Sequence, residues 1–231
     1  MRNSQKHVQK ACALEPEIPA YGAFLNLHGQ PVLIVGGGTV AARKAATLLA
    51  SGARVTLVAP HFDATLLKLK KLRANGSLQL LQRPFRVSDL KHQRLVFAAT
   101  DDPKLNARIC RAAEQKNIWS NCAAPPEAGS FSVPATVTRG RFALAVSTQG
   151  ASPALAAHWR KRLEKLVGPE WGELATLQIS LRKLAHERIK NPAKRRKLLL
   201  KIGHPKWAAK IKRLGVTAVK REMLALLFND K

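Results

Sequence analysis

The first half of the chain alternates short apolar runs with stretches whose apolar positions recur at helical spacing. Residues Val32 to Val35 form a continuous apolar run, largely β-branched, of the kind that is buried on both faces of a parallel sheet. Three glycines follow, and the apolar positions between Ala41 and Leu49 then lie on one face of a predicted helix. Further strands are predicted at 54–59, 78–81, 94–99 and 118–123, and further helices at 63–75, closed by Gly76, and from the cap Asp102-Pro103 to about Lys116. Strands that alternate with helices imply right-handed crossovers, so we expect an α/β fold with a doubly wound parallel sheet.

The pattern changes after residue 123. The segments 130–138 and 141–148 both look like strands, and no helix lies between them. Ser152-Pro153 then opens a helix, and the residues from there to Lys231 are predicted to form leucine-rich helices. Breaks between these helices are predicted near Gly168-Pro169, Asn191-Pro192 and His204-Pro205. We therefore expect a short stranded segment followed by a helical C-terminal part.

The three glycines form a turn that suits a negatively charged ligand. The sequence reads Gly36-x-Gly38-x-x-Ala41, an accepted variant of the dinucleotide fingerprint, and it lies between a strand and a helix. One glycine allows a tight turn, another lets backbone N–H groups approach a pyrophosphate, and the small third residue lets the helix pack against the strand. The free N–H groups and the positive end of the helix dipole then favour the anion. A tight turn without a ligand is the alternative, but the flanking strand and helix favour a nucleotide site.

Cysteine usage and the N-terminal sequence narrow the cellular setting. Cys12, Cys110 and Cys122 are far apart in the chain and form no C-x-x-C pair, so neither a disulfide framework nor a zinc ribbon is expected. Residues 1–27 contain no long apolar core, which argues against a signal peptide and against a membrane-spanning helix. We therefore expect a cytoplasmic protein with no bound metal and no membrane association.

The charge of the chain is strongly positive and uneven. The 231 residues include 40 Lys and Arg against 14 Asp and Glu, a formal net charge of +26 at pH 7. From Trp159 onward there are about twenty basic and about six acidic residues. Such a surface attracts polyanions, which include nucleic acid, anionic lipid and small molecules with many carboxylates. A solvated basic tail that serves solubility is the alternative, and the sequence leaves both open.

Four segments together resemble one known family. They are the turn from Gly36 to Lys44, "ATDDP" at Ala99, "SNCAAPPEAGSFSVPA" at Ser120 and "AVSTQGASPALA" at Ala145. In this order and spacing they resemble the N-terminal module of siroheme synthases, a family of precorrin-2 dehydrogenases, some of which are also sirohydrochlorin ferrochelatases. The resemblance runs from about Pro31 to about Leu163 and more loosely through the helical tail. We expect the stand-alone form, because no methyltransferase module follows.

The resemblance implies four regions. An N-terminal extension (1–25) precedes an NAD-binding Rossmann domain (26–124), a small dimerisation segment that exchanges strands between subunits (125–151) and a basic helical domain (152–231). It also implies a homodimer whose ligands are tetrapyrroles. We expect no nucleic acid partner.

The implied reaction removes a hydride and a proton from precorrin-2, giving sirohydrochlorin and NADH. Bifunctional members of the family then insert Fe(II), so Fe(II) is an implied further substrate. Precorrin-2 carries eight carboxylates, which a basic cleft would collect. The cofactor supplies the hydride chemistry, while the protein aligns the ring edge against the nicotinamide.

The implied cofactor contacts fall on the glycine turn and on the ends of the second and fourth strands. They are Gly36, Gly38, Thr39, Val40, Pro60, His61 and Thr100. The acid that commonly ends the second strand and binds the ribose hydroxyls of NAD is absent, since this strand ends Val58-Ala59-Pro60-His61. The choice of NAD over NADP therefore rests on the resemblance, and His61 is also open to interpretation as an exposed loop histidine.

The chain departs from the family at the expected general base. The family places an aspartate where this sequence has Ala124, and an alanine can neither accept a proton nor assist metal insertion. Glu127 on the same loop and Asp101 at the end of the fourth strand are the candidate catalytic residues. Asp102 is a further candidate whose simpler role is a helix cap. Thr148 falls where some relatives carry a phosphorylatable serine, and a plain turn hydroxyl is the alternative.

Three functions follow from these observations. The first is a precorrin-2 dehydrogenase, with or without chelatase activity. The second is a non-catalytic tetrapyrrole- or NAD-binding protein on the same fold, which Ala124 favours. The third is a nucleic-acid-binding module, which the charge favours, although Trp159, Trp171 and Trp207 belong to no recognisable base-stacking motif. The family resemblance places the dehydrogenase first.

Overall fold

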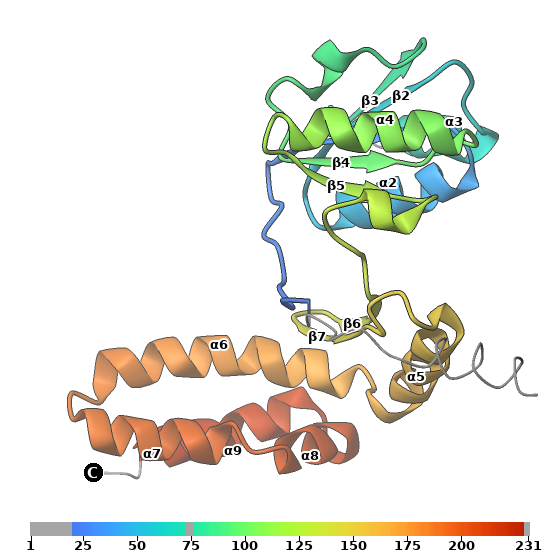
Figure 1. Cartoon of the computed structure of the whole chain (residues 1–231). Coiled ribbons are helices and arrows are strands. Elements are labelled where there is room, and N and C mark those ends of the chain that lie inside the picture. Colours follow the sequence, from blue (N-terminus) through green and yellow to red (C-terminus); the bar gives the residue numbers. More distant parts are fainter. Residues whose placement is uncertain (1–19, 73–75, 229–231) are drawn as a thin grey trace, which may run out of the picture. The chain divides into compact units, whose positions relative to one another are not determined.

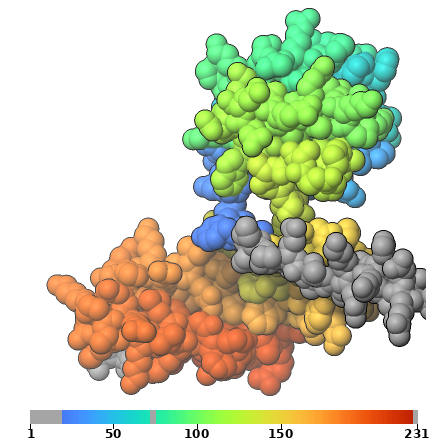
Figure 2. Space-filling view, viewed as in Figure 1, coloured from blue at the N-terminus to red at the C-terminus, as the bar shows by residue number. Residues whose placement is uncertain are grey.

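The structure, a computed structural model, describes residues 20–72 and 76–228. The chain divides into two compact units, Met1–Val133 and Pro134–Lys231, which can be followed by their labels in Figure 1 and by their colours in Figure 2. Cys12, most of the predicted N-terminal extension and the predicted helix end at Asn75 lie outside the described residues.

The first unit is built on a five-stranded parallel sheet. Its strands, in the spatial order β3-β2-β1-β4-β5, are β1 (Pro31–Val35), β2 (Arg54–Ala59), β3 (Leu78–Gln82), β4 (Leu95–Ala98) and β5 (Trp119–Cys122). β1 is central, because Val32 pairs with Val55 of β2 on one side and with Leu95 of β4 on the other. The strand order therefore reverses at β1, which makes its carboxyl end the switch point at which open α/β sheets bind ligands.

Helices cover both faces of this sheet (Figure 1). α2 (Thr39–Ala50) and α3 (Ala64–Leu72) pack on the face that buries Val32 and Ile34 of β1. α4 (Pro103–Glu114) packs on the opposite face, which buries Leu33 and Val35. Burial of alternate β1 side chains on two faces explains the unbroken apolar run in the sequence. The predicted doubly wound α/β fold is confirmed.

The helix after β4 begins as its sequence predicts. The side chain of Asp102 accepts a hydrogen bond from Lys104 N (2.8 Å), and Pro103 occupies the first turn, where its missing N–H is not needed. Two short 3-10 helices complete the unit, η1 (Val87–Leu90) and η2 (Pro126–Ala128).

The second unit joins a β-hairpin to a set of helices. β6 (Ala135–Arg139) and β7 (Phe142–Val146) pair antiparallel. The helices are α5 (Pro153–Leu166), α6 (Glu170–Arg188), α7 (Pro192–Ile202), α8 (Lys206–Leu214) and α9 (Val216–Phe228). The last four share an apolar core that includes Leu181, Leu198, Trp207 and Met223. The predicted breaks at the three proline-containing pairs are confirmed by the ends of α5, α6 and α7.

Two details of the second half differ from the prediction. The strand expected from residue 130 begins only at Ala135. The N–H groups of Ser130 and Phe131 bond to the carbonyl of Ser120 (2.8 and 3.1 Å), so they are not available for pairing with β7. An additional helix break lies at Gly215, whose φ of +79° is left-handed and ends α8 before α9 begins.

The turn before α5 uses the hydroxyl of Thr148. That hydroxyl donates to the Ser152 carbonyl (3.0 Å) and accepts from Ser152 N (3.0 Å), while the Ser152 side chain caps α5. Within the described part of the chain, every helix is too short or too polar to span a bilayer.

Candidate functional site

The first two glycines of the turn are required by the fold itself. Gly36 has a φ of +137°, and a Cβ added there would lie 2.1 Å from the carbonyl oxygen of Ala99. A Cβ added to Gly37 would lie 1.8 Å from the carbonyl oxygen of His61. Both neighbours are backbone atoms that cannot move aside, so any side chain at either glycine would displace the ends of β2 or β4.

Gly38 differs, because nothing in the fold requires it. Its φ of −88° and ψ of −170° are extended backbone that any residue adopts, and an added Cβ would meet no atom within 4 Å. Gly38 is the N-cap of α2, yet it offers no side chain to bond the first N–H groups of the helix, and the first turn contains no acid. The helix therefore begins with an uncapped positive end that faces open space, which is the arrangement that accommodates a phosphate.

A cavity of about 490 Å³ opens at this turn, at the carboxyl ends of the parallel strands. It is lined by the glycine turn, by the segment that follows β2, by Pro84 and Phe85 after β3, and by residues between β4 and α4. Six of the predicted site residues line it, namely Gly36, Gly38, Pro60, His61, Thr100 and Asp101. Thr39 and Val40 are exposed at the start of α2 and are not among its lining residues, and neither is Glu127, which is exposed in η2.

A fully buried asparagine ties this cavity to the loop that carries Ala124. Asn106 of α4 has no exposed surface, and its Oδ1 accepts bonds from the backbone N (3.0 Å) and the hydroxyl (2.8 Å) of Thr100. Its Nδ2 donates to the carbonyl of Thr100 (3.0 Å) and to the carbonyl of Ala124 (3.2 Å). One side chain thus fixes the exits of β4 and β5 relative to each other.

The other end of that loop is held by a lysine and a second asparagine. Lys44 of α2 donates from Nζ to Oδ1 of Asn121 (2.8 Å), and Asn121 donates from Nδ2 to the carbonyl of Phe131 (3.0 Å). Burial, together with the nearby charge of Arg43, lowers the pKa of Lys44. The ammonium also stands 5.0 Å from the centre of the Phe97 ring.

Sequence reasoning missed Asn106, Lys44 and Asp63, a carboxylate that lines the cavity after β2. Asn106 lies on the sheet-facing side of α4, and an asparagine among apolar neighbours at helical spacing is the signal that would have marked it. Asp63 immediately precedes α3 and caps it, so its sequence position indicated a helix cap and gave no sign that it lies near the glycine turn.

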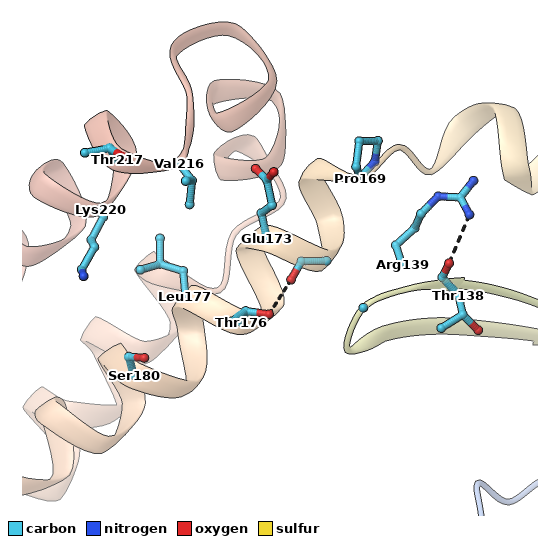
Figure 3. Close-up of a pocket in the computed structure, with 12 residues that line it drawn as sticks. Thr138, Arg139, Pro169, Glu173, Thr176, Leu177, Ser180, Val216, Thr217 and Lys220 are labelled. Carbon is cyan, nitrogen blue, oxygen red and sulfur yellow. Dashed lines mark hydrogen bonds between the residues drawn. The ribbon is translucent and has the colours of Figure 1, made fainter. Parts of the chain in front are cut away.

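A larger cavity, of about 770 Å³, lies within the second unit between the turn of the hairpin, α6 and the start of α9 (Figure 3). Its floor is one face of α6, with Thr176, Leu177 and Ser180 in sequence along the helix (Figure 3). The guanidinium of Arg139 donates to the carbonyls of Thr138 (3.1 Å), Glu164 (3.3 Å) and Val167 (3.0 Å). The hydrogen bonds of that arginine therefore serve the fold.

The helices of the second unit carry a largely uncompensated positive charge. The ion pairs within its described residues join Arg160 to Glu164 and Lys210 to Glu222. Many other cations are exposed on α6, α7 and α8, among them Arg182, Lys183, Lys194, Arg196, Lys197 and Lys212. Within residues 20–72 and 76–228, no three His, Cys, Asp or Glu side chains lie together as a metal site would need. The unit thus favours anionic ligands.

The strand order, the glycine turn and the cavity at the switch point define a dinucleotide-binding domain of Rossmann type. Residues 23–135 match a protein family described as "Putative NAD(P)-binding".

Relatives extend the comparison beyond this domain. Siroheme synthase 3 of Aeromonas hydrophila subsp. hydrophila is 38% identical over 174 residues, 75% of this chain and 36% of that protein. The siroheme synthase of Neisseria meningitidis serogroup B is 35% identical over 204 residues, 88% of this chain and 42% of that protein. The chain therefore spans less than half the length of these relatives. A solved structure titled "SirC, precorrin-2 dehydrogenase" superposes with a TM-score of 0.73 at 27% identity, covering 91% of this chain and all of the other. The chain is therefore similar to siroheme synthases and to this precorrin-2 dehydrogenase over most of its length.

Proposed function

We propose that the protein is an NAD-dependent dehydrogenase that oxidises precorrin-2 to sirohydrochlorin in the cytoplasm. The observation that carries the proposal is Gly38, a glycine that the fold does not need, at the uncapped start of α2 and at the switch point of the sheet. Its open space suits the pyrophosphate of a dinucleotide. The relatives named as siroheme synthases and the structure titled as a precorrin-2 dehydrogenase support this substrate.

Each part of the site has a proposed role. The first N–H groups of α2, with Thr39 and Val40, bind the pyrophosphate, and Pro60 and His61 contact the adenosine half. Thr100, fixed by Asn106, positions the nicotinamide end. NAD, when bound, supplies the hydride acceptor. The protein contributes alignment of the ring edge and exclusion of water.

The accompanying proton has no acceptor at Ala124. Asp101 lines the cavity at the exit of β4, so we favour it as the residue that takes this proton, with Glu127 as the second candidate. Chelation is more demanding, because pyrrole protons must leave while Fe(II) enters the ring. We therefore propose that ferrochelatase activity is weak or missing.

We also propose a homodimer that uses the hairpin of the second unit. β6 and β7 pair only with each other in the described chain, so each strand presents one unpaired backbone edge. Light scattering at micromolar concentration tests this, and a monomer would contradict it.

The basic helices are proposed to collect the carboxylates of the tetrapyrrole. If they do, sirohydrochlorin binding weakens as ionic strength rises, because salt screens exposed charges. Duplex DNA is then a weak competitor. Tight, sequence-tolerant DNA binding at physiological salt would instead favour the nucleic-acid function.

An anaerobic assay with purified protein, precorrin-2 and NAD tests the main proposal. We expect NADH and sirohydrochlorin to form in equal amounts, and the Gly38→Asp variant to form neither. Binding of NAD without any turnover would replace the dehydrogenase by a non-catalytic binding protein.

A further inference from the structure

An acidic residue lines the dinucleotide cavity, although the sequence pattern has no acid at the end of β2. β2 ends at Ala59 without an acid, but the chain after it folds back onto the glycine turn. Asp63 donates its backbone N–H to the carbonyl of Gly37 (2.8 Å), and the carbonyl of His61 lies against the Cα of the same glycine. Asp63 is therefore fixed beside the turn, and it lines the cavity.

The carboxylate of Asp63 bonds to Thr65, the second residue of α3. Oδ1 accepts a hydrogen bond from Thr65 N (2.7 Å) and so caps α3. The side chain of Thr65 also bonds this carboxylate. Bonds from Thr65 lower the pKa of Asp63, so the group is a carboxylate at neutral pH. A carboxylate has about four lone-pair sites, so this group can cap the helix and still accept a bond from a ligand.

We infer that Asp63 selects NAD over NADP. In dinucleotide-binding folds an acid about twenty residues beyond the glycine turn binds the ribose hydroxyls of NAD, and it repels the 2′-phosphate of NADP. Asp63 supplies that acid from the N-cap of α3 instead of from the last residue of β2, since the segment of Pro60 to Asp63 is held against the turn. The inference rests on the proposed dinucleotide site.

The other charged groups of the cavity do not supply this selection. Arg108 of α4 also lines the cavity, and an arginine can bind a 2′-phosphate. However, α4 packs on the face of the sheet opposite to α2 and α3, whereas Asp63 lies at the end of β2 on the side of α3. Asp101 lies beyond β4, on the other side of the central strand.

The inference is tested by variants that remove the charge of Asp63 but keep its capping bond to α3. Asn and Ser are both good N-cap residues, so Asp63→Asn and Asp63→Ser keep the bond to Thr65 N while they remove the carboxylate. Affinities for NAD and for NADP are measured separately by calorimetry, in the absence of tetrapyrrole. We expect the wild-type protein to prefer NAD and each variant to lose about tenfold or more of that preference, because a charged hydrogen bond and a charge repulsion disappear together.

A matched control uses the other aspartate N-cap of the same unit. Asp102 accepts from Lys104 N (2.8 Å) as Asp63 accepts from Thr65 N, but it is not among the lining residues of the cavity. Asp102→Asn is therefore expected to leave the ratio of NAD to NADP affinities unchanged. Arg108→Ala is the second comparison, and it should not raise the preference for NAD.

The outcomes separate this inference from the proposed function. The inference is overturned if both Asp63 variants keep the ratio of NAD to NADP affinities of the wild-type protein. It is also overturned if only Arg108→Ala changes that ratio. Wild-type protein that prefers NAD but fails to oxidise precorrin-2 refutes the proposed reaction and leaves the role of Asp63 intact. Failure of the wild-type protein to bind either dinucleotide overturns both.

Discussion

Substitution of Gly38 should separate ligand binding from folding. We expect Gly38→Asp to abolish NAD binding and at the same time to stabilise the free protein. The backbone of Gly38 is already in a conformation open to any residue, and its Cβ position is empty. A side chain there therefore reduces the freedom of the unfolded chain without a clash, which contributes about 0.4–1 kcal/mol. An aspartate at the uncapped N-terminus of α2 adds about 0.3–1 kcal/mol through the helix dipole.

The substitution is therefore expected to stabilise the free protein and to weaken its complex with NAD. A gain of about 1 kcal/mol raises the melting temperature of a chain of this size by roughly 2–4 °C. In the complex, a carboxylate about 4 Å from a pyrophosphate charge is unfavourable by about 4 kcal/mol at an effective dielectric constant of 20, which is roughly a thousandfold in affinity. Gly38→Ala adds the methyl group without the charge, so it should weaken binding far less.

Calorimetry with NAD and thermal unfolding of the free protein measure the two effects. Gly22→Asp is the matched control, because an added Cβ there also meets no atom within 4 Å and Gly22 lies outside the cavity. The control should keep the NAD affinity of the wild-type protein. If Gly38→Asp binds NAD normally, the turn does not hold the cofactor. If it unfolds at a lower temperature than the wild-type protein, our account of the N-cap is wrong.

Four further measurements follow from the same contacts. Ala124→Asp should raise the rate of precorrin-2 oxidation by up to about 10²–10⁴-fold, and an unchanged rate would show that a proton acceptor at this position is not limiting. Asn106→Ala should lower the free energy of unfolding in urea by about 1–3 kcal/mol, because it removes the side-chain hydrogen bonds that join the exits of β4 and β5, and a loss below about 1 kcal/mol would contradict this. The bonds of Arg83 hold the pKa of Asp89 below its ordinary value, so this pair stabilises the fold above the unfolded pKa of about 3.9 and its effect is lost as the pH falls through the folded pKa. Asp89→Asn should therefore lower the free energy of unfolding by about 1–3 kcal/mol at pH 7 and by less as the pH is lowered toward 2, and equal losses at both would refute the linkage. Burial raises the pKa of Cys110 to about 11, so its thiol should resist alkylation at pH 8 until the protein unfolds, and rapid native labelling would contradict the burial.

Local patterns were enough to predict the sheet and the glycine turn. The apolar run of β1 and the small residues of α2 depend only on neighbours in sequence, and each carries the periodicity of its element. Ser152 and Asp102 were likewise predictable, because an N-cap bonds the N–H groups two or three residues ahead. The prediction that a strand begins at residue 130 was wrong for the opposite reason. Its first residues bond to Ser120 on another strand, and no local pattern records that partner.

The polar contacts of the site depend on distant parts of the chain. Asn106 meets Ala124 across 18 residues, and Lys44 meets Asn121 across 77. Asp63 was overlooked because the expected acid was sought at the last residue of β2. Its actual position depends on how the intervening segment folds back onto Gly37, which the sequence alone does not specify.

The loop around Ala124 keeps its shape without any help from the side chain at that position. Its start is held by the bond from Asn106 to the Ala124 carbonyl, and its end by the bond from Asn121 to the carbonyl of Phe131. Ser130 closes it through its own bonds to Ser120. All of these contacts engage backbone atoms of the loop or side chains other than that of residue 124, and Ala124 itself is exposed. An aspartate can therefore replace the alanine without refolding the loop. It follows that the alanine at this position determines which chemistry is available there, whereas the shape of the loop is set by other residues.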